Sequence, residues 1–563
     1  MTSEEAVDFG PRIRAAYATD GATIDIGRAM LDGKVHPEAV VQVPTAMCNR
    51  HGLIAGATGT GKTVTLQLLA EQLSAQGVPV FTADMKGDLS GLVKAASPHP
   101  KITERVDEME LTYTATGSPV QFWALGGQGP GVSVRAAIGS FGPDLLAKVL
   151  DANETQRSSL ALVFHYADKQ GLALLDLVDL SDLLKYLISD EGKAELKTIG
   201  GLSSQTAGVL LRKMVELEQQ DAELFFGEPE LSIDHLMRLD DQGRGVINCL
   251  ELAQVQDRPR LFSTFLMWLL ASLFENLPEV GDLDKPKLVF FFDEAHLLFK
   301  DASKDFVDQV AQTVRLIRSK GVGVFFVTQL PDDVPDVVLS QLGNRVQHGL
   351  RAYTPRDAKA LKAAVTTYPK TDDYDLEEAL TQLGTGEAIV TTLTARGAPT
   401  PVAWTKVRPP QSQIGAVDPA EVQALAEASE MWATYAEEID RESAREMLAA
   451  RMGLESAGAS TAGGGAHSTA PPAVRPDLPP PPAGAYPSNA PSPDDLLRDS
   501  GIEGDPAENA PAPVERSTKA KPSKTSNKKD DGNPVSDFLK SREGRATVNN
   551  VVRGVFSLLK GRK

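Results

Sequence analysis

Cysteine is scarce in this chain of 563 residues, and histidine is thinly spread. Cys48 and Cys249 are the two cysteines, and the eight histidines form no cluster with the spacing of metal ligands. A disulfide framework and a cysteine-rich zinc site are therefore excluded. So few cysteines suit a reducing compartment, and we expect a cytoplasmic protein.

Long hydrophobic runs are also lacking. The most apolar stretch, Leu261 to Phe274, is 14 residues long and lies between Arg260 and Glu275. A helix needs about 20 apolar residues to cross a bilayer. We therefore expect a buried helix here and no integral membrane segment. The acidic N-terminus, MTSEEAVDFG, has no apolar core of the kind found in a secretory signal peptide.

Positive charge is in deficit, since the formal net charge is -19. A protein that coats DNA electrostatically is usually basic on at least one face. Any contact with nucleic acid must then be local, or shared among several subunits.

Strands and helices alternate along most of the chain. Residues 50–95 read as strand, loop, helix and strand, and residues 245–299 as strand, buried helix and strand. A helix near 303–319 leads to a third buried strand, GVGVFFVTQ, and residues 386–407 read as a terminal hairpin. This alternation predicts an α/β fold with a parallel sheet between helices.

The predicted domains follow from this pattern. We expect a short N-terminal β segment over residues 1–49, a domain over 50–410 with a largely helical insertion at about 96–240, and one charged helix over 411–454. Residues 455–534 are rich in proline, with 13 prolines between Pro471 and Pro513, and are predicted to be a disordered linker. Residues 535–563 are a candidate basic amphipathic helix that could dock on a protein partner, an acidic surface or a membrane, or could be an ordinary solvated tail.

The strongest motif lies between the first strand and the first helix. It satisfies the pattern G-x-x-x-x-G-K-[ST] in the required context. Its glycines let backbone N–H groups surround a phosphate, and the following helix adds its positive N-terminus. The lysine reaches the β- and γ-phosphates of ATP, and the threonine hydroxyl ligates Mg²⁺. The predicted nucleotide-binding residues are Gly56, Ala57, Thr58, Gly59, Thr60, Gly61, Lys62, Thr63 and Val64.

Two adjacent acids end the second strand of the 245–299 region. Five apolar residues, Leu288 to Phe292, precede Asp293 and Glu294. The first acid can complete the Mg²⁺ shell with Thr63, and the second can act as general base toward water. The adjacent pair indicates an ATP hydrolase rather than a kinase of small substrates. We expect no metal ion other than this nucleotide-bound Mg²⁺.

Further candidates follow the remaining strands. Gln329 would lie near the γ-phosphate if its strand lies between the other two, although glutamine also caps ordinary loops. Arg345 is the best candidate for an arginine that reaches a neighbouring subunit's nucleotide, ahead of Arg351, although either could form a surface ion pair. Asp84 could orient water or Mg²⁺, or merely cap a loop, and Lys86 beyond it has no assigned role.

Together, these motifs resemble the HerA/FtsK superfamily of P-loop ATPases, and most closely the bacterial HerA-like (YjgR-type) family. The resemblance rests on IDIGR, HGLIAGATGTGKT, FTADMKGDLSGL, FFFDEAH, and VTQ followed by NR, and covers about residues 20–410. It implies a RecA-like core with an additional strand and a catalytic glutamate, Glu294. It also implies assembly into a ring, commonly a hexamer, and translocation or unwinding of double-stranded DNA. The alternative is a motor that acts on a protein or secretion partner.

Overall fold

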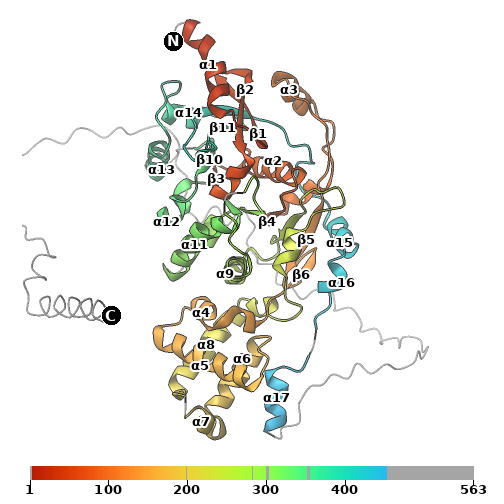
Figure 1. Cartoon of the computed structure of the whole chain (residues 1–563), viewed down its shortest axis with the longest axis vertical. Coiled ribbons are helices and arrows are strands. Elements are labelled where there is room, and N and C mark those ends of the chain that lie inside the picture. Colours follow the sequence, from red (N-terminus) through yellow and green to blue (C-terminus); the bar gives the residue numbers. More distant parts are fainter. Residues whose placement is uncertain are drawn as a thin grey trace, which may run out of the picture. The chain divides into compact units, whose positions relative to one another are not determined.

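The computed structural model describes residues 3–452, except residues 198, 282, 300–303, 352–354 and 440. The predicted linker at 455–534 and the predicted C-terminal helix at 535–563 lie outside the described residues. Figure 1 shows the helices and strands in sequence colours.

A single mixed sheet organises the fold, in the order β2-β1-β12-β11-β10-β3-β9-β8-β4-β7-β5-β6. The strands from β10 to β6 are parallel, and β11, β12, β1 and β2 continue the sheet in antiparallel fashion. The strands are β1 (Thr23–Leu31), β2 (Lys34–Pro44), β3 (Gly52–Ala55), β4 (Val80–Asp84), β5 (Val120–Leu125), β6 (Val132–Val134), β7 (Ile247–Glu251), β8 (Leu288–Phe292), β9 (Val322–Thr328), β10 (Asn344–His348), β11 (Glu387–Thr391) and β12 (Ala403–Val407).

Helices cover the central part of the sheet. Every residue of β3, β9, β8, β4 and β7 is buried, as expected for parallel strands that are covered on both faces. The helices before the insertion are α1 (Ser3–Tyr17), α2 (Lys62–Ala75) and α3 (Pro100–Glu108). Those after it are α9 (Pro259–Asn276), α10 (His296–Phe299), α11 (Lys304–Ile317), α12 (Asp336–Leu339), α13 (Pro355–Thr366) and α14 (Leu376–Gln382).

The predicted α/β, RecA-like architecture is confirmed. β9 lies between β3 and β8, which makes it the additional strand of this fold type. β11 and β12 form the predicted antiparallel hairpin. The apolar stretch from Leu261 to Phe274 lies within α9, where most of its side chains are buried. No helix among the described residues is long and apolar enough to cross a membrane.

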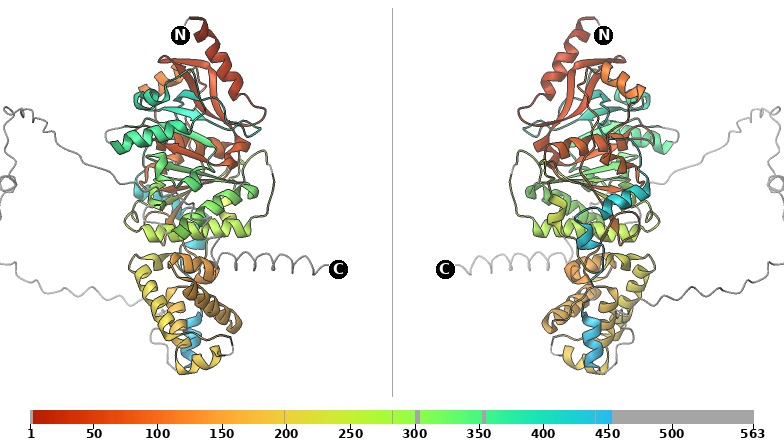
Figure 2. Two further views of the ribbon diagram at one scale, coloured as in Figure 1. Left: turned by 90° about the vertical axis from the view of Figure 1, so that its left-hand side faces the viewer. Right: turned by 90° about the vertical axis from the view of Figure 1, so that its right-hand side faces the viewer.

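The helical insertion is narrower than the predicted range of 96–240. Its helices are α4 (Ile138–Val149), α5 (Glu154–Gln170), α6 (Leu177–Leu187), α7 (Asp190–Leu196) and α8 (Ser204–Glu218), gathered into one group in Figure 2. β5 and β6 precede them and join the central sheet instead. The N-terminal segment also differs from the prediction, because α1 precedes its two strands.

The prediction of one charged helix over 411–454 is wrong. The segment forms three short helices, α15 (Pro419–Glu427), α16 (Trp432–Tyr435) and α17 (Ala444–Arg451). Two contacts interrupt a continuous helix. The Tyr435 hydroxyl accepts a 3.0 Å bond from the N–H of Ser232, which lies 203 residues away in the sequence, and Ser443 with Glu446 forms a capping box that starts α17. The spacing of charged residues along 411–454 does not indicate these contacts.

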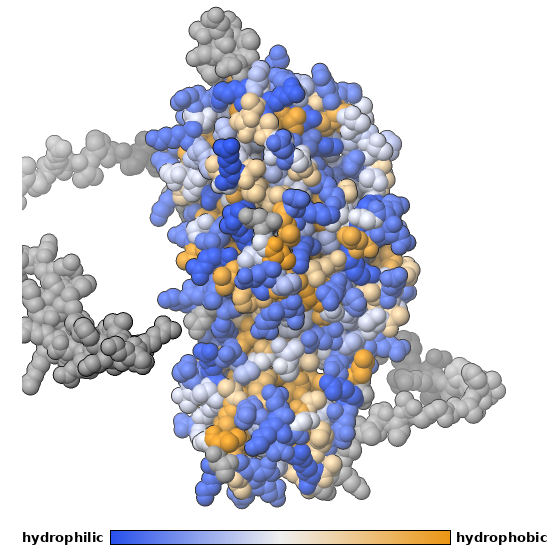
Figure 3. Space-filling view, viewed as in Figure 1, coloured by the Kyte–Doolittle hydropathy of each residue, from blue (hydrophilic) through white to orange (hydrophobic). Residues whose placement is uncertain are grey.

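The start of this segment is attached to α2. The buried Glu71 carboxylate accepts the N–H groups of Gln411 and Ser412 at 2.7 and 3.0 Å, and the Ser412 hydroxyl at 2.7 Å. A buried carboxylate needs such donors. The chain beyond β12 is thereby held beside the helix that follows the glycine-rich loop. On the face in Figure 3, apolar residues occur in small groups among hydrophilic ones.

Candidate functional site

The glycine-rich loop lies between β3 and α2, as predicted. Gly56, Gly59 and Gly61 have φ values of 151°, 77° and 117°, which glycine adopts without strain. A Cβ atom at position 56 would lie 2.6 Å from the Cβ of His348. Two backbone bonds of 2.9 Å close the loop, from the Ala57 N–H to the Gly349 carbonyl and from the Gly386 N–H to the Thr60 carbonyl.

The residues of the loop differ in exposure in a way that suits a bound phosphate chain. Thr58 and Gly59 are exposed, whereas Thr60 is buried and its hydroxyl donates a 2.7 Å bond to the Ala57 carbonyl. Thr63 and Val64 are partly buried in the first turn of α2. The open side of the loop therefore carries backbone N–H groups at the start of a helix.

Lys62 is the buried cation of this loop. Its ammonium group donates to the carbonyls of Gly56 at 2.7 Å and Ala57 at 3.3 Å. Burial lowers the pKa of Lys62, and the negative charge of Glu294 opposes that shift. The ammonium is thus held over the loop, where a phosphate would be a stronger acceptor than a peptide carbonyl.

The two acids lie where β8 ends. Asp293 and Glu294 are 3% and 6% exposed. Burial, followed by the charge of Glu294, raises the pKa of Asp293 to about 6. Glu294 has a φ of 48°, a left-handed conformation that is strained for a residue with a Cβ. Its N–H donates to the Asp293 carboxylate at 2.9 Å, and the Ala295 N–H donates to the Val327 carbonyl at 2.8 Å, so the turn is held.

Asp293 fits a Mg²⁺ site. Its Oδ2 atom is buried and has no hydrogen-bond partner within the described part of the chain. A carboxylate oxygen without a donor is unfavourable in a protein interior unless a cation or water completes it. The residues that would hold Mg²⁺ with a nucleotide are Asp293 and Thr63.

Gln329 leaves the sheet beside the glycine-rich loop. Thr328 of β9 pairs with Ala55 of β3, and the Gly56 N–H donates to the Thr328 carbonyl at 3.2 Å. Gln329 follows directly and is exposed. The condition set for its predicted role, a strand between β3 and β8, is met.

Comparison with known proteins agrees with this geometry. A model of the family described as "Helicase HerA-like C-terminal" matches residues 30–474. The chain belongs to this HerA-like family. The predicted membership of the HerA/FtsK group of P-loop ATPases is therefore confirmed.

Three relatives illustrate the range of similarity. A "Probable helicase MJECL08" of Methanocaldococcus jannaschii is 25% identical over 61% of this HerA-like chain and 64% of its own length, so the chain spans less than two thirds of it. The "DNA double-strand break repair helicase HerA" of Sulfolobus acidocaldarius is 22% identical over 68% and 70%. Among solved structures, "Plasmid coupling protein TrwB in complex with ADP and Mg2+" is 18% identical over 73% of this chain and 94% of that one, with a TM-score of 0.47.

The two arginine candidates of the HerA-like chain lie near opposite ends of β10. Arg345 pairs with Leu53 near the start of β3, so it lies three residues, or roughly 10 Å along the strand, before Gly56. Its Nε atom donates to the Leu342 carbonyl at 3.4 Å. Arg351 follows the opposite end of β10 and is exposed. The structure does not bring Arg345 to the loop of its own chain, and its role toward a neighbour stays a prediction.

Sequence reasoning missed His348, which supports the loop from behind. It is fully buried, and burial lowers its pKa to about 4, so the ring is neutral. Its Nδ1 lies 2.9 Å from the Glu387 carbonyl and its Nε2 lies 2.9 Å from the Thr65 hydroxyl. A carbonyl can only accept, so Nδ1 carries the proton and Nε2 accepts from Thr65. A histidine that ends a strand gave no signal of this contact in the sequence.

Lys86 and Asp84 acquire roles that the sequence left open. The Lys86 ammonium forms an ion pair with Glu294 Oε1. The Asp84 carboxylate accepts the N–H groups of Lys86, Gly87 and Leu89 at 3.1, 2.8 and 2.7 Å. Asp84 therefore caps the turn after β4, which was the structural alternative considered for it.

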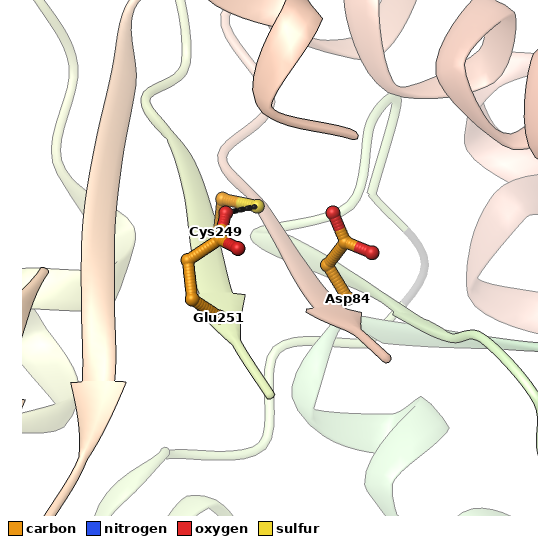
Figure 4. Close-up of side chains that lie close together, drawn as sticks. All are labelled: Asp84, Cys249 and Glu251. Atoms are coloured by element: carbon orange, nitrogen blue, oxygen red, sulfur yellow. Dashed lines mark hydrogen bonds between the residues drawn. The ribbon is translucent and has the colours of Figure 1, made fainter. Parts of the chain in front are cut away.

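A buried acid and a thiol lie beside Asp84 on the next strand. Figure 4 shows Asp84 of β4 facing Cys249 and Glu251 of β7, with the thiol 3.5 Å from Glu251 Oε1. Ligand atoms of the three residues lie within 4.8 Å of one another. Three N–H donors already occupy the Asp84 carboxylate, so the part of Asp84 in this cluster is to cap the turn after β4.

The cluster predicts a pH effect on stability. Burial, followed by the charge of Asp84, raises the pKa of Glu251 from 4.5 to about 8. Between these values the folded state binds more protons than the unfolded state, so raising the pH lowers the free energy of unfolding. We expect Glu251→Gln to remove this contribution. Thermal unfolding from about pH 5 to about pH 8 should show the wild-type Tm falling relative to the variant. Parallel Tm profiles would contradict the assignment.

Proposed function

We propose that this chain is a ring-forming motor that hydrolyses ATP to ADP and phosphate and moves double-stranded DNA. One observation carries the proposal: the loop Gly56–Thr63, Gln329 and the Asp293–Glu294 pair follow the carboxyl ends of the neighbouring strands β3, β9 and β8. Membership of the HerA-like family supports an ATPase motor. DNA as cargo is supported by the names of relatives, one of which is a DNA double-strand break repair helicase.

Each residue has a part in the proposed reaction. Lys62 and the backbone N–H groups of the loop bind the β- and γ-phosphates. Thr63 and Asp293 would hold Mg²⁺, which would supply positive charge to the phosphate oxygens of a bound nucleotide. Glu294 orients water and takes its proton, and Gln329 contacts the γ-phosphate.

A cavity beside the loop suits the base and ribose of ATP. Its volume is about 480 Å³, within the range of small-molecule sites. Gly61 and Val64 at the start of α2 form one wall, and Ile102, Gln413 and Ile414 contribute others. Arg105 fixes the floor by donating to the carbonyls of Gly386 and Val407 at 2.9 and 2.8 Å. We propose that ATP lies with its phosphates on the loop and its base in this cavity.

Ring assembly would complete the site from a neighbouring subunit. We propose a hexamer in which Arg345 approaches the neighbour's γ-phosphate and stabilises the transition state. A ring needs few basic residues per subunit to line its pore, so the net charge of -19 is compatible with a local DNA contact. We place the protein in the cytoplasm on the basis of its cysteine usage.

The alternative is a motor that acts on a protein partner through the C-terminal tail. The acidic charge of the whole chain makes wide contact with DNA unfavourable. Its positive charge is concentrated in the tail, where residues 515–563 contain 13 Lys and Arg against 5 Asp and Glu. Such a tail offers a basic docking segment that is distinct from the ATPase site.

Steady-state ATP hydrolysis with and without linear duplex DNA, at low and physiological salt, separates the two candidates. We expect DNA to stimulate ATP hydrolysis by the wild type, whereas Glu294→Gln should remain inactive with or without DNA. Native mass spectrometry tests separately whether the subunits form a ring. Hydrolysis indifferent to DNA would favour the protein partner, and removal of residues 455–563 would then abolish partner binding. A wild type without hydrolysis under all conditions would refute the ATPase proposal.

A further inference from the structure

One oxygen of the Glu294 carboxylate is engaged by a cation. The Lys86 ammonium contacts Oε1, whereas Oε2 lies 3.2 Å from Nδ1 of His296 and has no hydrogen-bond partner among the described residues. A general base must present a carboxylate oxygen to water at hydrogen-bond distance. In this arrangement an ammonium group occupies the position from which Oε1 would take a proton.

The backbone beneath Lys86 is held firmly, whereas its side chain reaches the surface. The three N–H bonds to Asp84 fix the turn, and Gly87 in that turn has a φ of 78°. The Lys86 side chain is 42% exposed, but that of Glu294 is only 7% exposed. The fixed turn after β4 thus places the partly exposed Lys86 ammonium against the buried Glu294 carboxylate.

Two lysines lie near Glu294, but only one contacts it. The charges of Glu294 and Lys86 both act on Lys62, whose ammonium donates its hydrogen bonds to the carbonyls of Gly56 and Ala57. Lys86 is therefore the cation that contacts Glu294 directly. The two lysines therefore have different partners: Lys62 binds the glycine-rich loop, and Lys86 binds the predicted base.

We propose that Lys86 is a positioning residue that holds Glu294 in a resting state, and that opening of this ion pair makes Glu294 a more effective base toward water. The inference rests on the proposed ATPase function. It assigns a restraint on turnover to the turn after β4, outside the loop and the acid pair. Removing the restraint raises the basal rate without changing how tightly the nucleotide binds.

The test compares basal ATP hydrolysis by the full chain with that of Lys86→Met. We expect kcat to rise about two- to fivefold with KM within about twofold, the scale that a partly exposed ion pair supports. Lys86→Arg keeps the ion pair and should stay near the wild-type rate. Lys185→Met is the matched control, since Lys185 forms a 2.8 Å surface pair with Asp182 on α6, and it should change nothing.

A double-mutant cycle gives a readout that does not depend on activity. If the pair forms, the effects of Lys86→Met and Glu294→Gln on the free energy of unfolding are not additive in chemical denaturation. Additive effects would overturn the inference, as would a kcat for Lys86→Met that is unchanged or reduced. A wild type that fails to hydrolyse ATP would instead refute the proposed function, and the inference with it.

Discussion

Glu294→Gln is expected to lower kcat by about 10²- to 10⁴-fold, the usual contribution of a general base. The amide matches the carboxylate in size and cannot take a proton from water. Its shape also preserves the turn, in which the Glu294 N–H bonds to Asp293 at 2.9 Å. Steady-state hydrolysis measures the effect on kcat, and the binding of a fluorescent ATP analogue measures the effect on nucleotide affinity. Affinity should remain within about threefold, because Glu294 binds water and not the phosphates.

Glu421→Gln is the matched control for this result. Glu421 forms a 2.6 Å ion pair with Lys94, and both side chains are about 40% exposed. Its replacement should leave kcat unchanged. If Glu294→Gln retained a rate within about threefold of the wild type, a different group would have to be the base.

Lys62→Met is expected to weaken ATP binding by about 100-fold or more and to reduce hydrolysis to background. Hydrogen bonds from a charged donor are worth about 1.5–3 kcal/mol each, and Lys62 is placed to make two with phosphates. Methionine fills a similar volume at this buried position, so the fold is kept. Equilibrium binding of a fluorescent ATP analogue, with circular dichroism for the fold, checks the prediction.

Lys62→Arg sharpens the interpretation. Lys62 is 7% exposed and its ammonium lies between two loop carbonyls, where the larger planar guanidinium does not fit. We expect this variant to bind ATP poorly even though it keeps the charge. Normal binding by Lys62→Met would show that the loop does not hold the phosphates in the proposed way.

The chemistry of the site was predictable because it is written in short local patterns. The spacing from Gly56 to Thr63 fixes a loop that glycine alone can form, and its flanking strand and helix can be recognised from apolar periodicity. Five apolar residues before Asp293 likewise predict a buried strand that ends in acids. Parallel strands align their carboxyl ends, so these motifs were expected at one edge.

Long-range contacts were not predictable from these patterns. The neutral His348 behind the loop depends on Thr65, and the division of residues 411–454 into three helices depends on partners such as Ser232. Both partners lie far along the chain. Periodicity describes only the face a helix or strand will bury, and several partners satisfy the same face. The strand β5 was absorbed into a predicted helical insertion for this reason.

The α/β class, the phosphate-binding loop and the acid pair could be predicted from the sequence, because neighbouring residues with consistent backbone and burial preferences encode each of them. The position of β9 between β3 and β8, the separation of Arg345 from its own loop and the contact of Lys86 with Glu294 emerge only in the folded chain. The order of strands and the meeting of distant charges are set by the packing of the whole sheet. No local preference specifies them.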